Sequence, residues 1–316
     1  ELLQLIRATS QRWEVSLASL DFTEDAKALL DDAAIGLLLP ERPIQWPNGA
    51  VAEVMAKASI SAEKMWKSIE IPWDEFDAVH ISVCRGSLEI LPLIPAHLPV
   101  HYHCLEPPRW LYEDVLHRHI DGTPKRPLWL TKMLFTRQRK RDRAYVKKLI
   151  QRPKSSISGN SMWIQKRLNT VYGIASDPTK ENGEPPKRDG NGCPTEATHV
   201  MHVIDWELWP EQPTKKETTS LKSVENIPEQ YVVTVGRISH VKGTWDTLQS
   251  LANTQLALVQ VGGGDEADKA ALQVEGKRIG VEVICMPRLS QTQLCALIRG
   301  ARAMVSHAYH EPFGLT

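Results

Sequence analysis

The sequence lacks any pair of cysteines at the Cys-x-x-Cys spacing of a structural zinc site. Its five cysteines are widely spaced along 316 residues, and their odd number argues against a disulfide framework. Scattered thiols of this kind are typical of a reducing compartment, so we expect the protein to be cytoplasmic. The sequence also has no Asp-x-Asp motif and no cluster of histidines and carboxylates at ligand spacing, and we therefore predict no metal site.

Long apolar runs and an excess of one charge are absent as well. No stretch of 18 or more apolar residues occurs, and no membrane-spanning helix is expected. The 38 basic residues balance the 38 acidic ones, which gives no indication of a nucleic-acid-binding protein. The chain begins with glutamate, shows no signal peptide and stops without a closing element, so we expect a sequence cut at both ends.

What the sequence does contain is a regular alternation of strand-like and helix-like segments. In the first part, strands are expected at 15–20, 78–83, 99–104 and 155–159, and helices at 24–30, 137–151 and 162–172. In the last part, strands are expected at 231–235, 256–261, 281–285 and 303–306, and helices at 243–251, 267–279 and 291–301. Such alternation predicts an α/β fold with parallel sheets covered on both faces.

Two polar stretches divide the chain. Residues 176–199 are rich in Lys, Glu, Asn, Gly and Pro, which predicts a flexible insertion outside the core. Residues 210–228 form a second polar stretch, which we interpret as a linker between domains. The sequence therefore predicts an N-terminal domain over 1–209 and a C-terminal domain over 229–316.

Three motifs follow the strands of the C-terminal domain. The first is Gly236-Arg-Ile-Ser, with Lys242-Gly opening the next helix; its two cations either bind a diphosphate or lie solvated on a surface turn. The second is the run of glycines at 262–264, which allows a close approach of the backbone but matches neither a P-loop nor a dinucleotide-binding motif. The third is Glu-Pro-Phe-Gly-Leu at 311–315.

In this order and spacing, the three motifs resemble glycosyltransferase family 4, a retaining family. The resemblance implies the glycosyltransferase B fold, with two Rossmann-like domains facing across a cleft. It implies that Arg237 and Lys242 hold the donor diphosphate, that Glu311 lies near the transferred sugar, and that backbone N–H groups of the last motif bind phosphate or sugar. The second glutamate of the motif would lie beyond Thr316, and the family's opening Gly-rich turn is not found. The positions implied at the donor are Gly236, Arg237, Lys242, Gly262, Gly263, Gly264, Glu311, Phe313, Gly314 and Leu315.

The segment from His101 to Asp114 resembles, more thinly, a part of the same family in which a histidine lies at the cleft beside the donor sugar. We carry that role to His103; His101 shares its strand face and is the weaker candidate. The alternative is a structural histidine bonded to a backbone carbonyl. Glu106 and Arg109 either bind acceptor hydroxyls or pair with each other. Ser161, with Asn160, is interpreted as a helix N-cap.

The resemblance implies the transfer of a hexose, with retention, from a nucleoside-diphosphate sugar to a glycan or a lipid-linked acceptor. No cofactor or metal is expected, because the two cations and a helix start would stabilise the departing diphosphate. Two alternatives stay open. One is another enzyme of the same fold, such as a sucrose- or glycogen-synthase-like enzyme or an epimerase. The other is a non-catalytic module that binds a nucleotide sugar.

The stretch 125–154 contains twelve basic residues and one acidic residue, Asp142. A solvated helical face is one interpretation. The other is a peripheral contact with an anionic membrane, on its inner face, which suits a membrane-embedded acceptor. We do not expect nucleic acid as the partner of this stretch, since acidic and basic residues balance over the whole chain.

Overall fold

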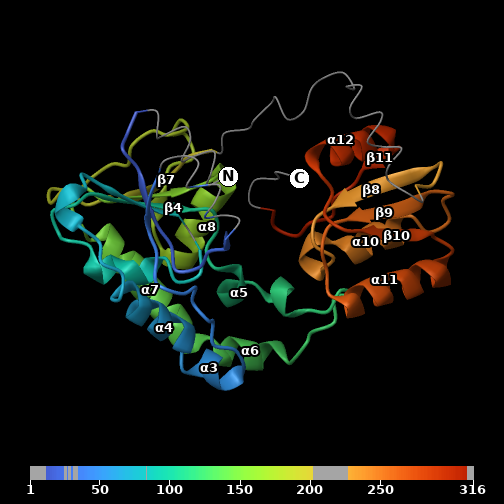
Figure 1. Ribbon diagram of the computed structural model, residues 1–316, viewed down its shortest axis with the longest axis horizontal. Coiled ribbons are helices and arrows are strands. Elements are labelled where there is room, and N and C mark those ends of the chain that lie inside the picture. Colours follow the sequence, from blue (N-terminus) through green and yellow to red (C-terminus); the bar gives the residue numbers. More distant parts are fainter. Residues whose placement is uncertain are drawn as a thin grey trace. The chain divides into compact units, whose positions relative to one another are not determined.

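Figure 1 shows the chain in a computed structural model. The structure describes residues 12–24, 27, 30, 35–82, 84–201 and 227–311. The chain divides into two compact units, one of Glu1–Tyr112 with Trp129–Val203 and the other of Glu113–Leu128 with Ile204–Thr316. Each unit contains a parallel sheet with helices, so the α/β class that the alternation predicted is confirmed. None of the helices in the described ranges is long and apolar enough to cross a membrane.

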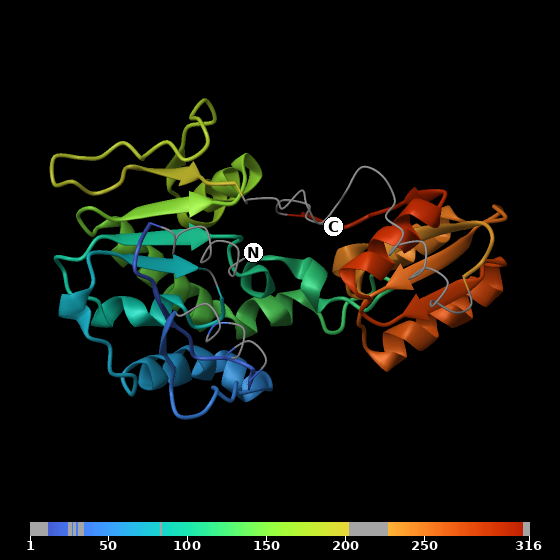
Figure 2. The ribbon, with the colours of Figure 1, turned by 45° about the horizontal axis from the view of Figure 1, so that its top comes forward.

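Among the described residues, the first unit has five parallel strands in the order β3-β4-β5-β7-β6. The longer strands of this sheet appear as arrows in Figure 2. Their bounds are β3 Val79–Ser82, β4 Val100–Cys104, β5 Ser156–Gly159, β6 Ala175–Ser176 and β7 Glu196–His199. A separate pair of parallel strands lies earlier in the chain, formed by β1 (Ser16–Ala18) and β2 (Gly36–Leu38). The four strands expected in this half are therefore present, and β2, β6 and β7 are additional.

The helices of this unit are α3 Ala50–Val54, α4 Lys57–Trp66, α5 Arg109–Tyr112, α6 Leu128–Leu134, α7 Thr136–Ile150 and α8 Met162–Tyr172, with 3-10 turns η1 Trp73–Glu75 and η2 Leu88–Leu93. Helix α8 has the predicted bounds. Its N-cap is Ser161, whose hydroxyl accepts a hydrogen bond from the backbone N–H of Ile164 at 3.2 Å, so the N-cap interpretation is confirmed. The helix expected at 24–30 lies largely outside the described residues.

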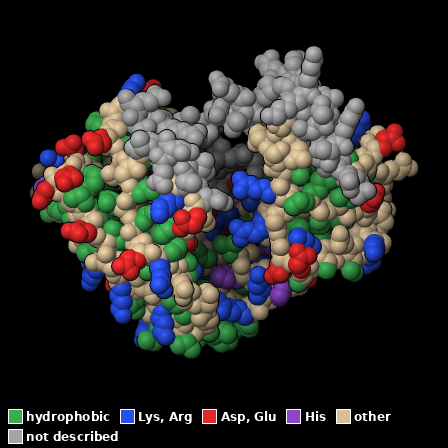
Figure 3. Space-filling view, viewed as in Figure 1, with side chains coloured by type: hydrophobic (Ala, Val, Ile, Leu, Met, Phe, Trp, Pro, Cys, Tyr) green, Lys and Arg blue, Asp and Glu red, His purple; other side chains and the backbone are tan. Residues whose placement is uncertain are grey.

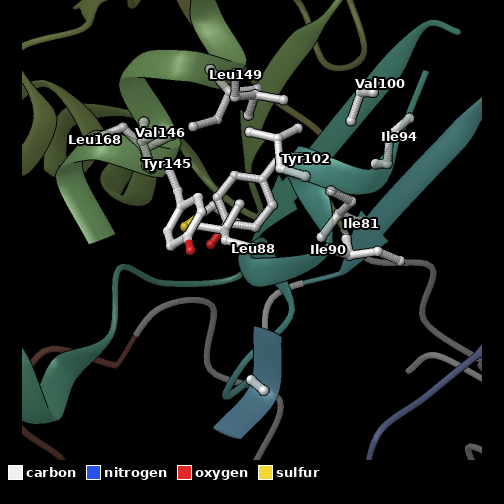
Figure 4. Close-up of a cluster of buried hydrophobic side chains, with 14 of the residues drawn as sticks. Ile81, Leu88, Ile90, Ile94, Val100, Tyr102, Tyr145, Val146, Leu149 and Leu168 are labelled. Atoms are coloured by element: carbon white, nitrogen blue, oxygen red, sulfur yellow. The ribbon is translucent and has the colours of Figure 1, made fainter. Parts of the chain in front are cut away.

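The core of the first unit lies on one face of the sheet. Tyr102 of β4 is fully buried there, next to side chains from α7 and α8, as Figure 4 shows. The neighbouring strands add Ile81 and Ile157 to the same cluster. Because side chains alternate along a strand, His101 and His103 point to the opposite face. The strand pattern therefore separates an apolar face from a polar one.

Strand β7 corrects the prediction of a flexible insertion over 176–199. All four of its residues are buried, and the strand pairs with β5 and β6 inside the sheet. Its first residue, Glu196, forms an ion pair with Lys180 at 2.8 Å and accepts a hydrogen bond from the backbone of Lys187. The expectation of a loop was wrong for these residues, because the charge of Glu196 is neutralised by partners that the polar composition did not reveal.

The described part of the second unit has four parallel strands in the order β10-β9-β8-β11. The bounds are β8 Tyr231–Val235, β9 Ala257–Val261, β10 Val283–Met286 and β11 Ala303–Met304, with η5 His240–Lys242 and helices α10 Thr244–Ser250, α11 Glu266–Ile279 and α12 Gln291–Gly300. Val232 of β8 belongs to one buried cluster and Val233 to another, so the sheet is covered on both faces. The predicted elements of this half are thus all present.

The boundary between the units differs from the one expected. Residues 113–128, which the sequence analysis placed in the N-terminal domain, group with the second unit. The reason is Ile120, which is buried in the same cluster as Val232 and Leu258. The segment begins with the 3-10 turn η3 Asp114–His117. Of the linker expected at 210–228, only residues 227 and 228 are among those that the structure describes.

Candidate functional site

The first predicted motif forms the turn after β8. Gly236 has a φ of +134°, a conformation that side chains rarely adopt. Its carbonyl accepts a hydrogen bond of 2.8 Å from the buried side chain of Gln260, and its N–H donates to the carbonyl of Val261 at 2.9 Å. Arg237 follows and is exposed. The turn is therefore held by hydrogen bonds to β9, while the side chain of Arg237 is exposed.

The turn continues through η5 to Gly243, which packs directly on the loop after β11. Gly243 has a φ of +62°, and a Cβ atom there would overlap the carbonyl oxygen of His307. The hydroxyl of Thr247 bonds both to the carbonyl of Gly243, at 3.0 Å, and to Nδ1 of His307, at 3.0 Å. The backbone of Tyr309 also donates to the carbonyl of Val241 at 2.9 Å. The first and third motifs are therefore held in one assembly.

This assembly brings together two residues that the sequence analysis assigned to the donor. Nζ of Lys242 lies 2.9 Å from Oε2 of Glu311, although 69 positions separate the two residues. Both side chains are partly exposed, at 29% and 28%. The pair lies at the carboxyl ends of β8 and β11, the edge at which open α/β sheets bind ligands. A cation and a carboxylate are thus available at the same point of this edge.

The glycine run at 262–264 lies beside the first motif. Gly262 has a φ of +128°, and a Cβ there would overlap the carbonyl oxygen of Gly236. Gly264 forms an isolated bridge with Ile238, and a Cβ on it would come within 2.7 Å of the Cβ of Ile238. At Gly263, by contrast, a Cβ would meet nothing within 4 Å. Packing between the two loops therefore accounts for two of the three glycines.

Phe313, Gly314 and Leu315, which the resemblance placed at the phosphate or sugar, lie outside the described residues. The structure therefore brings together Gly236, Lys242, Gly262, Gly264 and Glu311 in the second unit, with Arg237 and Gly263 in the same loops. The predicted residues of the N-terminal half belong to the first unit.

His103 lies on the polar face of the first sheet and is buried. Its Nδ1 is 2.9 Å from the hydroxyl of Ser158 on β5. His101 reaches the same hydroxyl through Nε2, at 3.0 Å, and the hydroxyl of Ser156 through Nδ1, at 2.7 Å. These serines were missed in the sequence, although they alternate along β5 as the two histidines do along β4.

A third histidine that the sequence analysis missed, His80 of β3, completes this cluster. It pairs in register with His101, and its ring centroid lies 5.2 Å from that of His101 and 6.1 Å from that of His103. Burial, and then the positive charge of the two neighbouring imidazoles, lowers the pKa of His101 to about 3. His101 is therefore neutral near pH 7 and acts there as a hydrogen-bonding group.

Glu106 and Arg109 follow β4 at the start of α5. Nε of Arg109 lies 3.5 Å from Oε2 of Glu106. The alternative that the two residues pair with each other is therefore confirmed, and their predicted role toward an acceptor stays a prediction.

Comparisons with known proteins bear on both units. Residues 215–316 match the family described as Glycosyl transferases group 1. Among solved structures, the chain is similar to Anabaena Alr3699/HepE in complex with UDP and glucose, with a TM-score of 0.59 and 16% identity over 99% of this chain and 71% of that one. The complex of the same protein with UDP-glucose gives a TM-score of 0.58 and 17% identity, with the same coverage. A search of curated proteins found no match.

The likeness to these structures covers nearly the whole chain and shows a glycosyltransferase B fold, in keeping with two parallel α/β units. The class of protein that this fold and the matched domain define is the glycosyltransferases. More particularly, the similarity to the family Glycosyl transferases group 1 extends over residues 215–316.

Proposed function

We propose that the chain is a retaining glycosyltransferase of family 4. It would move a hexose from a nucleoside-diphosphate sugar to a glycan or a lipid-linked acceptor. The observation that carries this proposal is the contact of Lys242 with Glu311 at the carboxyl edge of the second sheet. HepE was crystallised with UDP and with UDP-glucose, so UDP-glucose is the first donor to test.

Lys242 and Arg237 suit the leaving group of this reaction. When the bond from the anomeric carbon to the diphosphate breaks, negative charge grows on the phosphate oxygens, and fixed cations stabilise that charge most effectively. We propose that the protein does this without a metal, because the sequence lacks an Asp-x-Asp motif. Backbone N–H groups of residues 313–315 would add hydrogen bonds to the phosphate or the sugar.

Glu311 would change partner when the donor binds. In the structure its carboxylate accepts a hydrogen bond from Lys242. A diphosphate competes for the same ammonium group because it carries more negative charge than one carboxylate. We propose that Glu311 then accepts hydrogen bonds from hydroxyls of the transferred sugar and orients the anomeric carbon.

On the first unit, His103 is proposed to contact the donor sugar, and Ser158 would fix the orientation of its ring through the hydrogen bond of 2.9 Å. A buried imidazole of this kind can donate or accept a hydrogen bond from its second nitrogen. Glu106 and Arg109 would contact hydroxyls of the acceptor after exchanging their mutual contact for them.

The test compares Lys242→Ala and Arg237→Ala with the unchanged protein. We expect turnover of UDP-glucose to fall about 10²–10³-fold in each variant, the effect of removing one group that stabilises transition-state charge. UDP affinity, measured by calorimetry, should fall as well. Lys269→Ala is the matched control, because Lys269 also pairs with a glutamate, Glu266, on the surface of the same unit. Near-normal turnover in both test variants would refute the diphosphate assignment.

Two other functions are separated by the same assays. Product analysis distinguishes transfer to a glycan from sucrose or glycogen synthesis and from epimerisation. A non-catalytic module would bind UDP or UDP-glucose in the calorimeter and release no sugar.

A further inference from the structure

The first unit exposes a group of large apolar side chains on two helical segments, α3 and α6. Trp129 and Met133 of α6 are 68% and 58% exposed, and Val51 and Met55, at α3 and its C-cap, are 70% and 46% exposed. In Figure 3, hydrophobic atoms appear beside Lys and Arg side chains on the part of the surface that α3 and α6 form. Single exposed apolar residues are common in proteins, whereas a group of this kind indicates an interaction surface.

The two segments form one surface. Trp129 and Met133 are four positions apart on α6 and therefore lie on the same side of that helix. Arg137, at the start of α7, follows Met133 by four positions and reaches the C-cap of α3, where its Nη1 lies 4.0 Å from Sδ of Met55. The apolar side chains are thus continuous with the first basic residue of α7.

A row of cations extends this surface along α7. Arg137, Lys140, Lys147 and Lys148 are exposed, and their spacing of three, seven and one positions places them along one side of the helix. Two other basic residues of α7, Arg139 and Arg141, are only partly exposed and bond to neighbouring elements. Nη1 of Arg139 donates to the carbonyl of Lys132 at 3.0 Å, and Nε of Arg141 donates to the hydroxyl of Ser59 at 2.9 Å. The stretch therefore contains one basic face and not a continuous basic surface.

The residues Val51, Met55, Trp129, Met133, Arg137, Lys140, Lys147 and Lys148 are called here the α3–α6–α7 surface. We propose that this surface docks on an anionic lipid bilayer, with the apolar side chains entering the headgroup region and the cations contacting lipid phosphates. Tryptophan and lysine next to apolar side chains are typical of groups that lie at a membrane interface. The long stems of Lys and Arg also let their charges reach headgroups beside a buried apolar patch.

Charge complementarity favours an anionic bilayer as the partner of this surface. Helix α7 carries five exposed cations, the four of this surface and Arg143, whose guanidinium lies 5.5 Å from the centroid of the Tyr112 ring. Its one acidic residue, Asp142, accepts a hydrogen bond of 2.6 Å from Tyr112 and is partly buried. An anionic bilayer offers both a negative surface and an apolar interior, and thus fits both parts of the surface. The proposal rests on the proposed function in one respect: a protein bound to the bilayer through this surface would reach a lipid-linked acceptor.

The test is sedimentation of the protein with two kinds of vesicle, phosphatidylcholine alone and phosphatidylcholine with phosphatidylserine. We expect binding to the second kind and little to the first. Lys140→Glu and Lys147→Glu should each weaken binding at least about fivefold, the effect of one basic residue near an anionic surface. Lys277→Glu is the matched control, because Lys277 is an exposed lysine on α11 of the second unit. It should bind as the unchanged protein does.

The apolar part is tested separately with Trp129→Ser and Met133→Ser. Val274→Ser is their control, because Val274 is 67% exposed on α11. We expect the first two variants to bind anionic vesicles several-fold more weakly and the control to bind normally. All of these side chains are exposed, so the variants should keep the unfolding midpoint and the UDP affinity of the unchanged protein.

Equal binding to both kinds of vesicle would overturn the proposal, and so would normal binding by the α7 variants. Normal binding by the α6 variants would overturn the entry of the apolar side chains into the bilayer. UDP affinity, measured in the same samples, tests the donor site independently of the membrane surface. If the protein binds UDP but no vesicles, only the membrane surface is refuted. If the protein binds vesicles but no UDP, only the donor site is refuted.

Discussion

Gly243→Ala tests whether the contact between the first and third motifs is as close as the structure has it. Gly243 and Gly280 both have left-handed backbone conformations, with φ of +62° and +76°. A Cβ in such a conformation costs about 1–2 kcal/mol, so alanine at either position should lower the free energy of unfolding by that amount. At Gly280 the new Cβ meets nothing within 4 Å, whereas at Gly243 it overlaps the backbone carbonyl of His307. Because a backbone carbonyl cannot rotate away as a side chain can, we expect Gly243→Ala to lower the free energy of unfolding by a further ~1–3 kcal/mol, the cost of overpacking.

The assay is urea unfolding of the two variants, with hydrogen exchange of the amides in β8 and β9 to report on the second unit by itself. Gly280→Ala should lower the free energy of unfolding by the smaller amount. Gly243→Ala should lower it by about 2–5 kcal/mol and should also weaken UDP binding, because Lys242 precedes the displaced residue. Equal losses in the two variants, with UDP affinity unchanged, would refute the contact between the motifs.

Two further predictions concern the first unit. His101 binds a proton near pH 6.5 when unfolded and, because burial lowers its pKa, only near about 3 when folded. Its contribution to stability is therefore full above pH 6.5 and is lost as the pH falls toward 3, by about 1.4 kcal/mol per pH unit. Urea unfolding between pH 7 and pH 5 should show this slope, and His101→Gln should reduce it; the same slope in the variant would contradict the assignment. Glu196→Gln removes the carboxylate that lies 2.8 Å from the buried ammonium of Lys180, which keeps the more exposed Glu184, at 3.4 Å, as its remaining ion-pair partner. We expect the free energy of unfolding to fall by about 1–3 kcal/mol, and an unchanged urea midpoint would show that the ion pair does not stabilise β7.

The helices and strands whose apolar residues repeat with a clear period along the sequence were predicted well. Helix α8 has the bounds expected from its apolar spacing, and the four strands of the second unit lie where apolar runs are bounded by turn residues. Strand β7 could not be found in this way. Its sequence, Glu-Ala-Thr-His, becomes buried because Lys180 neutralises Glu196 and the neighbouring strands pair with its backbone. Likewise Ile120 gives no local sign that it packs in the core of the second unit.

The sequence by itself determined the α/β class, the order of the three donor motifs and the histidines of β4, because these depend on short-range period and on motif spacing. Only the tertiary structure decided which of these residues meet. Lys242 contacts Glu311 because parallel strands bring loops that are distant in the chain to one edge of the sheet. His80 joins His101 through strand register, which no single segment specifies. The α3–α6–α7 surface depends in the same way on the bonds that Arg139 and Arg141 make to neighbouring elements, since these turn two cations of α7 away from the exposed row.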